Sequence, residues 1–195
     1  MGNLLNLVLA SENQHKQKEF QAVLGESFRL LTLRDVQFRQ SLPVESGSTY
    51  EENASIKALF VGKELGVPVL ADDSGFEVEA LGGQPGVLSA RFMGGADSRT
   101  QCLEILKRLS SASNRSARFV CVLALYWPQS KGLSLFRGEC RGNVAMSLTG
   151  EKGFGYDPIF LPEGLTRSFS ELESAEKWKI SHRGRAFELL RASLG

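Results

Sequence analysis

The amino-acid sequence predicts an α/β fold with a mixed β-sheet. Short apolar runs of strand length alternate with segments whose apolar residues recur at helical spacing. Some predicted strands are separated by helices and others follow one another directly, which indicates a mixed sheet. Hydrophobic residues make up 42% of the 195 residues and charged residues 23%, as in ordinary globular proteins. This length predicts one large domain, or one domain with a smaller lobe.

The first part of the chain predicts a strand, a helix and a second strand. Residues 4–10 are an apolar run, and they lead through a polar turn into a helix over residues 11–25. Residues 28–33 are expected to form the second strand. Thr49 and Glu52 then have the spacing of a capping box, which predicts the start of another helix.

The middle of the chain predicts two strands joined by a turn. Residues 67–71 are a continuous apolar run, typical of a buried strand, and residues 76–80 alternate between apolar and polar. The sequence DDSG between them is expected to form the turn. Asp97 or Ser98 is expected to cap the helix that follows.

The second half predicts further strands and then a helical end. Residues 118–127 and 132–136 are expected to pair as strands, with another strand near residues 143–148. From about residue 170 to 194 the pattern is helical in two pieces, and Ser181 is expected to be the N-cap of the last helix.

Charge and cysteine content narrow the function classes. Lys and Arg number 23 against 22 acidic residues. The net charge of +1 is too small to attract a polyanion such as a nucleic acid to the protein as a whole. The three cysteines are widely spaced without a CxxC motif, which disfavours a disulfide framework or a thiolate metal site. No segment has the pattern of a secretory signal or a membrane span. We therefore expect no nucleic-acid partner, no membrane association and a cytoplasmic location.

Asp72, Asp73, Ser74 and Gly75 place two carboxylates, a hydroxyl and a permissive glycine at a predicted strand end. Such a group can hold a hydrated Mg²⁺ or activate a water, although the same residues are common in simple turns. If both aspartates are extended, their side chains point to opposite faces and one of them serves structure. If a turn begins at Asp72, both carboxylates can approach one Mg²⁺.

Two groups of side chains lie near the predicted helix starts. Ser11, Asn13 and Lys16 lie where the first strand passes into the first helix, and a helix N-terminus favours an anion. The alternative is an ordinary helix cap beside an exposed lysine. The second group contains Glu45, Glu52, Asn53 and Lys57. Capping explains Glu52, and Lys57 lies five residues later, so the two need not share a helix face. Lys57 either reaches a cleft or is exposed to solvent.

Two C-terminal groups suit recognition of a flat, polar ligand. In the segment GFGYDP, two glycines permit unusual backbone angles, while Phe154 and Tyr156 either stack on a base or pack beneath a loop. Asp157 precedes a proline and can form a local turn. His182 and Arg183 lie at a predicted helix N-terminus, where cations are disfavoured unless an anionic or carbonyl-like group is bound.

Together these groups resemble the Ham1 family of inosine triphosphate pyrophosphatases, also called non-canonical purine nucleoside triphosphate pyrophosphatases. The resemblance extends over almost the whole chain. It is carried, in the family's order, by LVLASENQHKQKEF, STYEENASIKA, LADDSGFEVEALGGQPGVLSARF, GEKGFGYDPIFLPEG and AEKWKISHRGRAFELL. The most specific parts are DDSG with GGQPGVLSAR, and FGYDPIF together with ISHRG.

The resemblance implies two lobes around an elongated mixed β-sheet with a central substrate cleft. Residues 1–195 would then form a single domain without a separable linker. It also implies hydrolysis of ITP, dITP and XTP to the nucleoside monophosphate and pyrophosphate, which cleanses the nucleotide pool. Mg²⁺ as cofactor, water attack on the α-phosphorus and a homodimer are further implications.

The resemblance also implies roles for individual residues. Asp73 and Lys57 would be catalytic, and Asp73 would bind the metal together with Glu45 or Asp72. The triphosphate would be bound by Ser11, Asn13 and Lys16, and Ser74 would contact the substrate. The base and sugar pocket would be formed by Phe154, Gly155, Tyr156 and Asp157, and the purine would be read by Lys177, His182 and Arg183.

Two positions depart from the family's usual pattern. Glu12 stands where a small residue is common, which adds a carboxylate beside the predicted triphosphate site, and Glu45 is a single acid where two are common. Two other functions are left open. One is a related pyrophosphatase for other modified or pyrimidine nucleotides, and the other is a non-catalytic nucleotide- or RNA-binding module, which the near-neutral charge disfavours for RNA.

Overall fold

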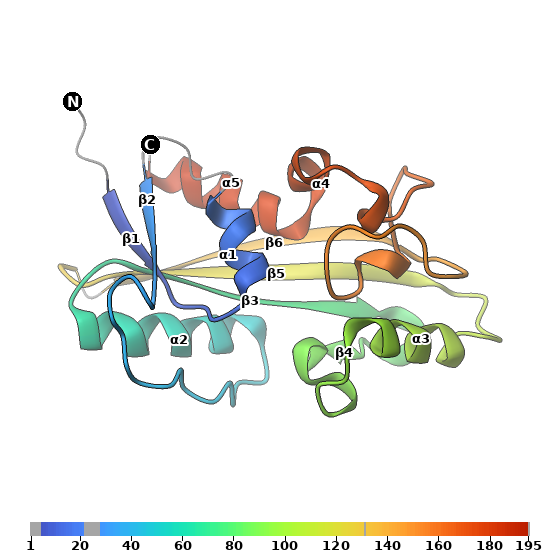
Figure 1. Ribbon diagram of the computed structural model, residues 1–195, viewed down its shortest axis with the longest axis horizontal. Helices are drawn as coiled ribbons and strands as arrows, with labels where there is room; N and C mark the ends of the chain where they lie inside the picture. Colours follow the sequence, from blue (N-terminus) through green and yellow to red (C-terminus); the bar gives the residue numbers. More distant parts are fainter. Residues whose placement is uncertain (1–4, 22–27, 131, 195) are drawn as a thin grey trace. The chain divides into compact units, whose positions relative to one another are not determined.

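The structure is a computed structural model that describes residues 5–21, 28–130 and 132–194. These residues form the predicted α/β fold (Figure 1). Their strands are β1 (Leu5–Leu9), β2 (Phe28–Thr32), β3 (Val69–Val78), β4 (Pro85–Gly86), β5 (Ser116–Trp127), β6 (Gly132–Val144) and β7 (Phe160–Pro162). Their α-helices are α1 (Gln14–Gln21), α2 (Tyr50–Leu65), α3 (Ser98–Arg108), α4 (Ser174–Ile180) and α5 (His182–Leu194).

The sheet is mixed, as predicted. Its strands pair in the order β2-β1-β3-β5-β6-β7, and β4 pairs with β3. Strand β1 runs parallel to β2 and to β3. Helix α1 lies between β1 and β2 in the chain, and α2 lies between β2 and β3. Strands β3 and β4 are antiparallel, as are β6 and β7. Parallel neighbours require such a crossover, whereas antiparallel neighbours do not.

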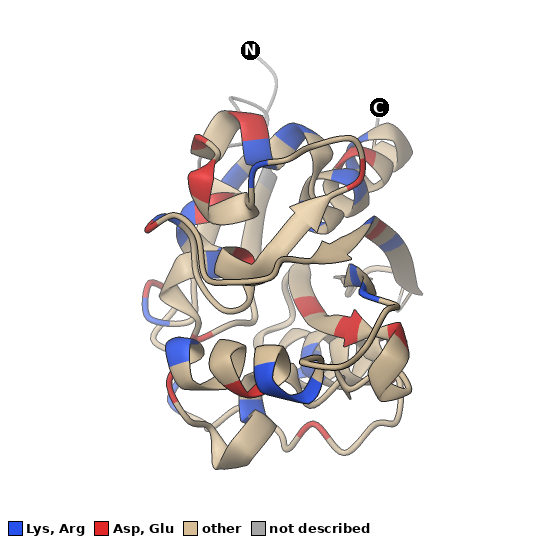
Figure 2. Cartoon of the chain, turned by 90° about the vertical axis from the view of Figure 1, so that its right-hand side faces the viewer, with Lys and Arg blue, Asp and Glu red and all other residues tan. Residues whose placement is uncertain are grey.

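The chain divides into two compact units. Unit 1 contains residues 1–73 and 122–136, and unit 2 contains residues 74–121 and 137–195. Each boundary falls inside a strand, namely β3, β5 or β6. Within unit 1, α1 and α2 lie on opposite faces of the strands (Figure 1). Figure 2 shows Lys and Arg interspersed with Asp and Glu along the ribbon, in keeping with the near-zero net charge.

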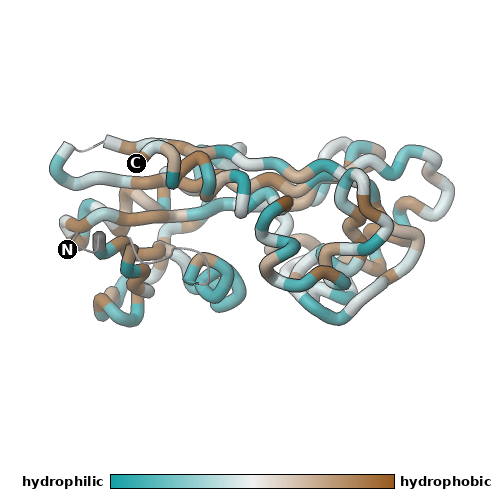
Figure 3. Tube along the Cα trace, turned by 90° about the horizontal axis from the view of Figure 1, so that it is seen from above, coloured by the Kyte–Doolittle hydropathy of each residue, from teal (hydrophilic) through white to brown (hydrophobic). Residues whose placement is uncertain are grey.

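Each unit contains buried apolar residues, and the strands supply many of them. Figure 3 shows hydrophobic and hydrophilic residues alternating along the chain. The buried residues of unit 1 include Leu7, Val8, Leu9, Ala54, Ala58, Val61, Val69, Leu70, Val122, Leu123 and Leu125. The core of unit 2 is rich in aromatic rings and includes Phe76, Phe119, Tyr156, Phe160 and Phe169. The three cysteines, Cys102, Cys121 and Cys140, are buried. None of the described helices combines the length and apolar character needed to cross a membrane.

The predicted turn at DDSG is wrong, because β3 continues through these residues as one strand. Val69 and Leu70 pair with β1 before the segment, and Phe76 and Glu77 pair with β4 after it. Backbone pairing on both sides therefore favours extended geometry through residues whose side chains are individually common in turns. Asp72 and Asp73 are thus neighbours within a strand.

The predicted strands at 132–136 and 143–148 are replaced by one longer strand, β6, which ends at Val144. The intervening Arg137, Glu139 and Arg141 are charged, so this part of the strand has no apolar signal. Arg137 and Glu139 form an ion pair at 2.9 Å. Side chains on the polar face of a strand can be charged without breaking the backbone pairing, which is why the sequence pattern missed the middle of β6.

The helix boundaries agree with the capping signals. Thr49 and Glu52 form the predicted capping box at the start of α2, and Asp97 caps α3. Ser181 separates α4 from α5, and its Oγ accepts a hydrogen bond from the Gly184 N–H at 3.1 Å. The first predicted helix extends to residue 25 and the first predicted strand begins at residue 4; residues 22–25 and 4 lie outside the described residues.

Candidate functional site

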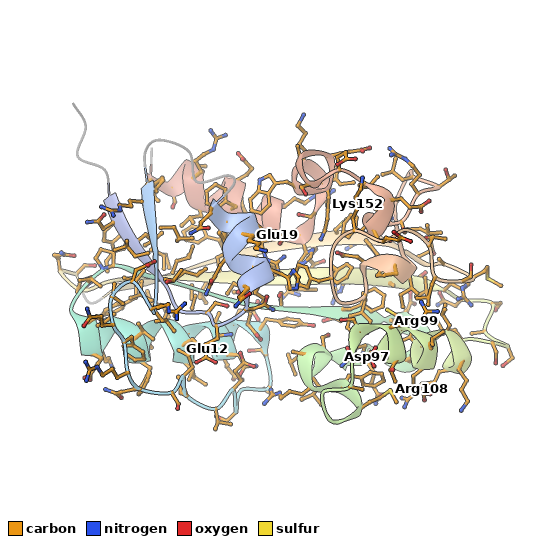
Figure 4. The ribbon with its side chains drawn as sticks, viewed as in Figure 1. Glu12, Glu19, Asp97, Arg99, Arg108 and Lys152 are labelled. Carbon is orange, nitrogen blue, oxygen red and sulfur yellow. The ribbon has the colours of Figure 1, made fainter. Side chains whose placement is uncertain are left out.

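The connection between β1 and α1 in unit 1 carries the predicted phosphate-binding residues. Ser11 is buried, and its Oγ accepts a hydrogen bond from the Asn13 N–H at 3.2 Å. Asn13 Oδ1 accepts from the backbone N–H groups of His15 and Lys16, at 3.0 and 3.2 Å. Asn13 therefore acts as a helix cap, which was one of the two predicted explanations. Glu12, which departs from the family pattern, is exposed in this connection (Figure 4).

Lys16 is directed at the DDSG segment. The Ala10 N–H donates to the Leu70 carbonyl at 2.8 Å, so the residue after β1 lies beside the part of β3 that precedes Asp72. Lys16 Nζ lies 2.9 Å from Asp72 Oδ2, and the Lys16 side chain is 14% exposed. The alternative of an exposed lysine is therefore wrong, and Lys16 and Asp72 form a largely buried ion pair.

Asp72 and Asp73 point to opposite faces of β3, as extended geometry requires. Asp72 pairs with Lys16 on α1, whereas Asp73 Oδ1 lies 3.5 Å from Lys57 Nζ on α2. These two helices lie on opposite faces of the sheet (Figure 1). The turn that would have brought both carboxylates to one Mg²⁺ is absent from these described residues. Asp73 and Asp72 thus have separate partners.

Lys57 joins the carboxylates of Glu45 and Asp73. Its Nζ donates to Glu45 Oε1 at 2.5 Å, and its side chain is only 7% exposed. Solvent exposure of Lys57, the alternative considered from the sequence, is therefore wrong. Asn53, one helical turn earlier on α2, donates from Nδ2 to Asp73 Oδ2 at 3.3 Å. Asp73 thus has a donor facing each of its two oxygens.

Burial and neighbouring charges set the pKa values in this group. Burial raises the pKa of Asp73 to about 6, and the positive charges of Lys57 and Lys16 only partly oppose it, while Glu45 and Asp72 raise it further. Burial lowers the pKa of Lys57, but the carboxylates of Asp72, Asp73 and Glu45 outweigh burial and raise it overall. Asp73 is thus a carboxylate with unusually high proton affinity beside a cation, which is suited to general-base chemistry near neutral pH.

Glu45 and Asp73 also fit the requirements of a divalent cation. Both carboxylates approach Lys57 Nζ, and the charge of Glu45 raises the pKa of Asp73, so added positive charge would relieve their repulsion. The described residues contain no group of three or more His, Cys, Asp or Glu side chains arranged for a metal. Mg²⁺ commonly uses one or two carboxylates and takes its other ligands from water and substrate phosphates. The two carboxylates are therefore compatible with Mg²⁺.

The GFGYDP segment in unit 2 is held by Asp157. Its Oδ2 accepts from the Phe154 N–H at 2.8 Å and from Lys177 Nζ at 2.7 Å. Gly153 has a φ of +76°, and a Cβ added there would lie 2.0 Å from Asp157 Oδ2, so a glycine is required at this turn. Gly155 also has a positive φ, of +62°, as its predicted unusual backbone angle requires.

Phe154 presents a partly exposed ring flanked by cations. Lys177 Nζ lies 5.1 Å and Arg183 Cζ 5.7 Å from the ring centroid. Arg183 is buried, with 2% exposure, and its Nη2 donates to Ser74 Oγ at 3.1 Å. Four of the predicted substrate-binding residues are thereby brought together in unit 2. An aromatic face bordered by hydrogen-bond donors is suited to a base with carbonyl groups.

His182 and Tyr156 differ from simple pocket residues. His182 is buried and stacks on Phe119, with 4.7 Å between ring centroids and 12° between ring planes. Tyr156 lies in the core, where its ring stacks on Phe76 at 5.0 Å and its hydroxyl donates to the Ser89 carbonyl at 2.9 Å. The Tyr156 side chain therefore packs beneath the loop, which was one of the two predicted alternatives, and the partly exposed Phe154 ring is the candidate for stacking.

Two contact residues have no predicted role in the site. Asn53 precedes Lys57 by four positions, so the helical spacing of the two residues could have placed both on one face of α2. Phe119 lies within the apolar run of β5, and nothing in that run distinguishes the residue that supports His182. The first omission had a usable sequence signal, whereas the second did not.

Known proteins resemble this chain over nearly its whole length. A family model described as the Ham1 family matches residues 7–193. A dITP/XTP pyrophosphatase of Deinococcus deserti is 47% identical over 188 residues, covering 96% of this chain and 88% of that protein. One from Christiangramia forsetii is 43% identical over 187 residues, covering 95% and 97%. The solved structure of the Staphylococcus aureus Ham1 protein is similar with a TM-score of 0.87 and 37% identity, covering 97% of each chain.

Proposed function

This chain belongs to the Ham1 family, and from that membership we propose that it hydrolyses non-canonical purine nucleoside triphosphates to the monophosphate and pyrophosphate. The proposed substrates are dITP and XTP, which the names of its relatives specify, together with ITP. The observation that carries the proposal is the buried contact of Lys57 with both Asp73 and Glu45. Such an enzyme removes these nucleotides from the cellular pool, for which we propose a cytoplasmic location.

The residues of unit 1 are proposed to act on the triphosphate. At the N-terminus of α1, Ser11, Asn13 and Lys16 supply a hydroxyl, a side-chain amide and a cation suited to phosphate oxygens. Asp73 accepts the proton of the water whose oxygen forms a bond to the α-phosphorus. The bond from that phosphorus to the bridging oxygen breaks, and Lys57 stabilises the negative charge that develops on departing pyrophosphate.

Mg²⁺ is the proposed cofactor, with Asp73 and Glu45 as the residues that would hold it. When bound, such an ion polarises phosphate oxygens and lowers the pKa of a coordinated water. Asp72 is the weaker candidate, because its carboxylate already pairs with Lys16 on the other face of β3. The assembly that we propose is a homodimer, whose mass in solution would be about twice that of the 21.4 kDa chain.

The residues of unit 2 are proposed to select the base. Phe154 offers an aromatic face for stacking, and Lys177, His182 and Arg183 supply donors for the 6-oxo group of the purine. A 6-amino group would present a donor to these donors and leave them unpaired. Buried polar groups that lose their partners can discriminate by about 10⁴-fold or more. ATP and dATP should therefore be poor substrates.

Pyrophosphate release from dITP, XTP, ITP, GTP and ATP, each with and without Mg²⁺, tests this function. We expect kcat/KM for dITP, XTP and ITP to exceed that for ATP by about 10³-fold or more, and activity to be lost in EDTA. Release of single phosphate in place of pyrophosphate would contradict the reaction type. Equal kcat/KM for ITP and ATP would contradict the proposed base selection, and preference for another modified nucleotide would favour the related pyrophosphatase considered above.

A further inference from the structure

Asn53 is a fully buried amide in unit 1 to which the proposed mechanism gives no role. Its Oδ1 accepts a hydrogen bond from the Gly47 N–H at 2.8 Å, and its Nδ2 donates to Asp73 Oδ2 at 3.3 Å. A backbone N–H only donates and an ionised carboxylate only accepts, so the two partners define the orientation of the amide. One side chain thus links a loop backbone to the proposed general base.

The other oxygen of Asp73 faces the next turn of the same helix. Asp73 Oδ1 lies 3.5 Å from Lys57 Nζ. Lys57 follows Asn53 by four residues, which places both side chains on one face of α2. Lys57 contacts only one oxygen of the Asp73 carboxylate. Lys57 and Asn53 together define the plane of that carboxylate.

The Asn53 amide has two arms, its Nδ2 donor toward Asp73 and its Oδ1 acceptor toward Gly47. The second arm holds the segment that carries Glu45. Gly47 lies two residues after Glu45, and a Cβ added at Gly47 would lie 2.6 Å from Glu52 Cβ and 2.7 Å from Asn53 Oδ1. Only glycine allows this close approach. Glu52 Oε2 also accepts from the Ser48 N–H at 2.6 Å, so two consecutive side chains of α2 anchor the segment. The anchored segment ends at Glu45, whose Oε1 reaches Lys57 Nζ.

We propose that Asn53 is a positioning residue that sets the carboxylate of Asp73 and the segment carrying Glu45 relative to Lys57. The proposal rests on the proposed pyrophosphatase function, in which these three side chains act on the triphosphate. Asn53 acts through them and does not touch the substrate. Outer residues that orient reactive or metal-binding groups typically contribute about 10- to 100-fold in activity.

Two substitutions separate the two arms of the amide. Asn53→Asp keeps an oxygen for the Gly47 N–H but replaces the donor that faces Asp73 with a second carboxylate, whereas Asn53→Ala removes both arms. At pH 8 we expect both variants to lower kcat for dITP by about 10- to 100-fold, with KM changed by less than about threefold. Hydrogen exchange of the Gly47 amide should stay slow in Asn53→Asp and become about tenfold faster in Asn53→Ala.

Gln101→Ala is the matched control. Gln101 is also a buried amide on a helix, and its Nε2 donates to the Phe92 carbonyl at 2.9 Å. We expect this variant to lose thermal stability but to keep kcat within about twofold of the wild type. Asn53→Asp differs little in size from the wild type, so it carries the test if Asn53→Ala does not fold.

The possible outcomes separate the two proposals. A folded Asn53→Asp variant with wild-type kcat would overturn the positioning role, as would a loss of kcat that only follows the folded fraction. A wild-type protein that releases no pyrophosphate would instead overturn the proposed function. Slow Gly47 exchange in Asn53→Ala would show that the amide does not anchor the Glu45 segment, and would remove that arm of the proposal.

Discussion

Burial raises the pKa of Asp73, which the position of this residue in the sequence alone does not indicate. The residue is 5% exposed, and burial raises the pKa of its carboxyl to about 6 from the ordinary 3.8. Asp72, the next residue, points to the opposite face and pairs with Lys16. The adjacent carboxylates thus differ in role because strand geometry directs them to different partners.

The raised pKa of Asp73 predicts a pH-dependent cost in stability. Because its folded pKa lies above the unfolded value, Asp73 contributes stability below pH 4, and this contribution is lost as pH rises through 6. Asn at this position stays neutral. In metal-free buffer we therefore expect the free energy of unfolding of Asp73→Asn, relative to the wild type, to increase by up to about 3 kcal/mol between pH 4 and pH 8. Urea unfolding at each pH measures the difference.

Asp97 provides a control of opposite sign. Hydrogen bonds from the Thr100 side chain and backbone lower the pKa of Asp97, which caps α3 (Figure 4). The wild-type residue therefore stabilises the fold above its unfolded pKa, and this contribution is lost as pH falls. Relative to the wild type, Asp97→Asn should become less stable as pH rises from the folded pKa of Asp97 toward its unfolded pKa. The same trend for Asp73→Asn would contradict the assignment of a raised pKa to Asp73.

The sequence predicted most of the candidate site residues, but it predicted their surroundings less well. The five-residue spacing from Glu52 to Lys57 does not indicate that Lys57 is buried beside Glu45 and Asp73, because that burial depends on the fold of the segment before α2. The side-chain packing of Tyr156 against Phe76 is similarly a tertiary contact between distant residues. Residue type indicates which groups can react, whereas burial and partners depend on contacts that a local pattern does not contain.

Among the helices and strands, local sequence patterns predicted the helix starts correctly but did not predict how far the strands β3 and β6 continue. The capping box at Thr49 and Glu52 was predicted because it depends on residues three positions apart. The continuity of β3 and β6 depends instead on pairing with neighbouring strands, which are distant in sequence. Polar residues such as Asp72 and Arg141 therefore give no strand signal in the sequence, although β3 and β6 continue through them.

The turn before Phe154 predicts a substitution that affects substrate binding. Gly153→Ala places a Cβ against Asp157 Oδ2, the oxygen that holds both the Phe154 N–H and Lys177. We expect KM for dITP to rise about tenfold or more, because the stacking ring and one donor lose their common anchor. Steady-state kinetics measures the change.

Gly164→Ala is the matched control for this turn. Gly164 has a similarly positive φ of +81°, but a Cβ there would have nothing within 4 Å. Both variants incur backbone strain of about 1–2 kcal/mol, and only Gly153→Ala disturbs Asp157. An equal rise in KM in both variants would show that strain alone, and not the Asp157 contact, is responsible.

At the scale of the whole molecule, the two units share three strands. Their boundaries fall inside β3, β5 and β6. One domain over residues 1–195 without a separable linker, which the family resemblance implies, is still a prediction. We expect a single cooperative unfolding transition, with calorimetric and van't Hoff enthalpies that agree. Two resolved transitions, or proteolysis that releases one unit intact, would contradict this prediction.

We propose that Asp73 performs the chemistry of a non-canonical purine triphosphate pyrophosphatase. The most direct test is kcat for dITP in Asp73→Asn and Asp72→Asn, measured with saturating Mg²⁺ on folded proteins. We predict that Asp73→Asn lowers kcat by about 10²- to 10⁴-fold. Asp72→Asn should mainly change KM, since its partner Lys16 is proposed to bind the triphosphate. A folded Asp73→Asn variant with near-normal kcat would contradict the catalytic role of Asp73.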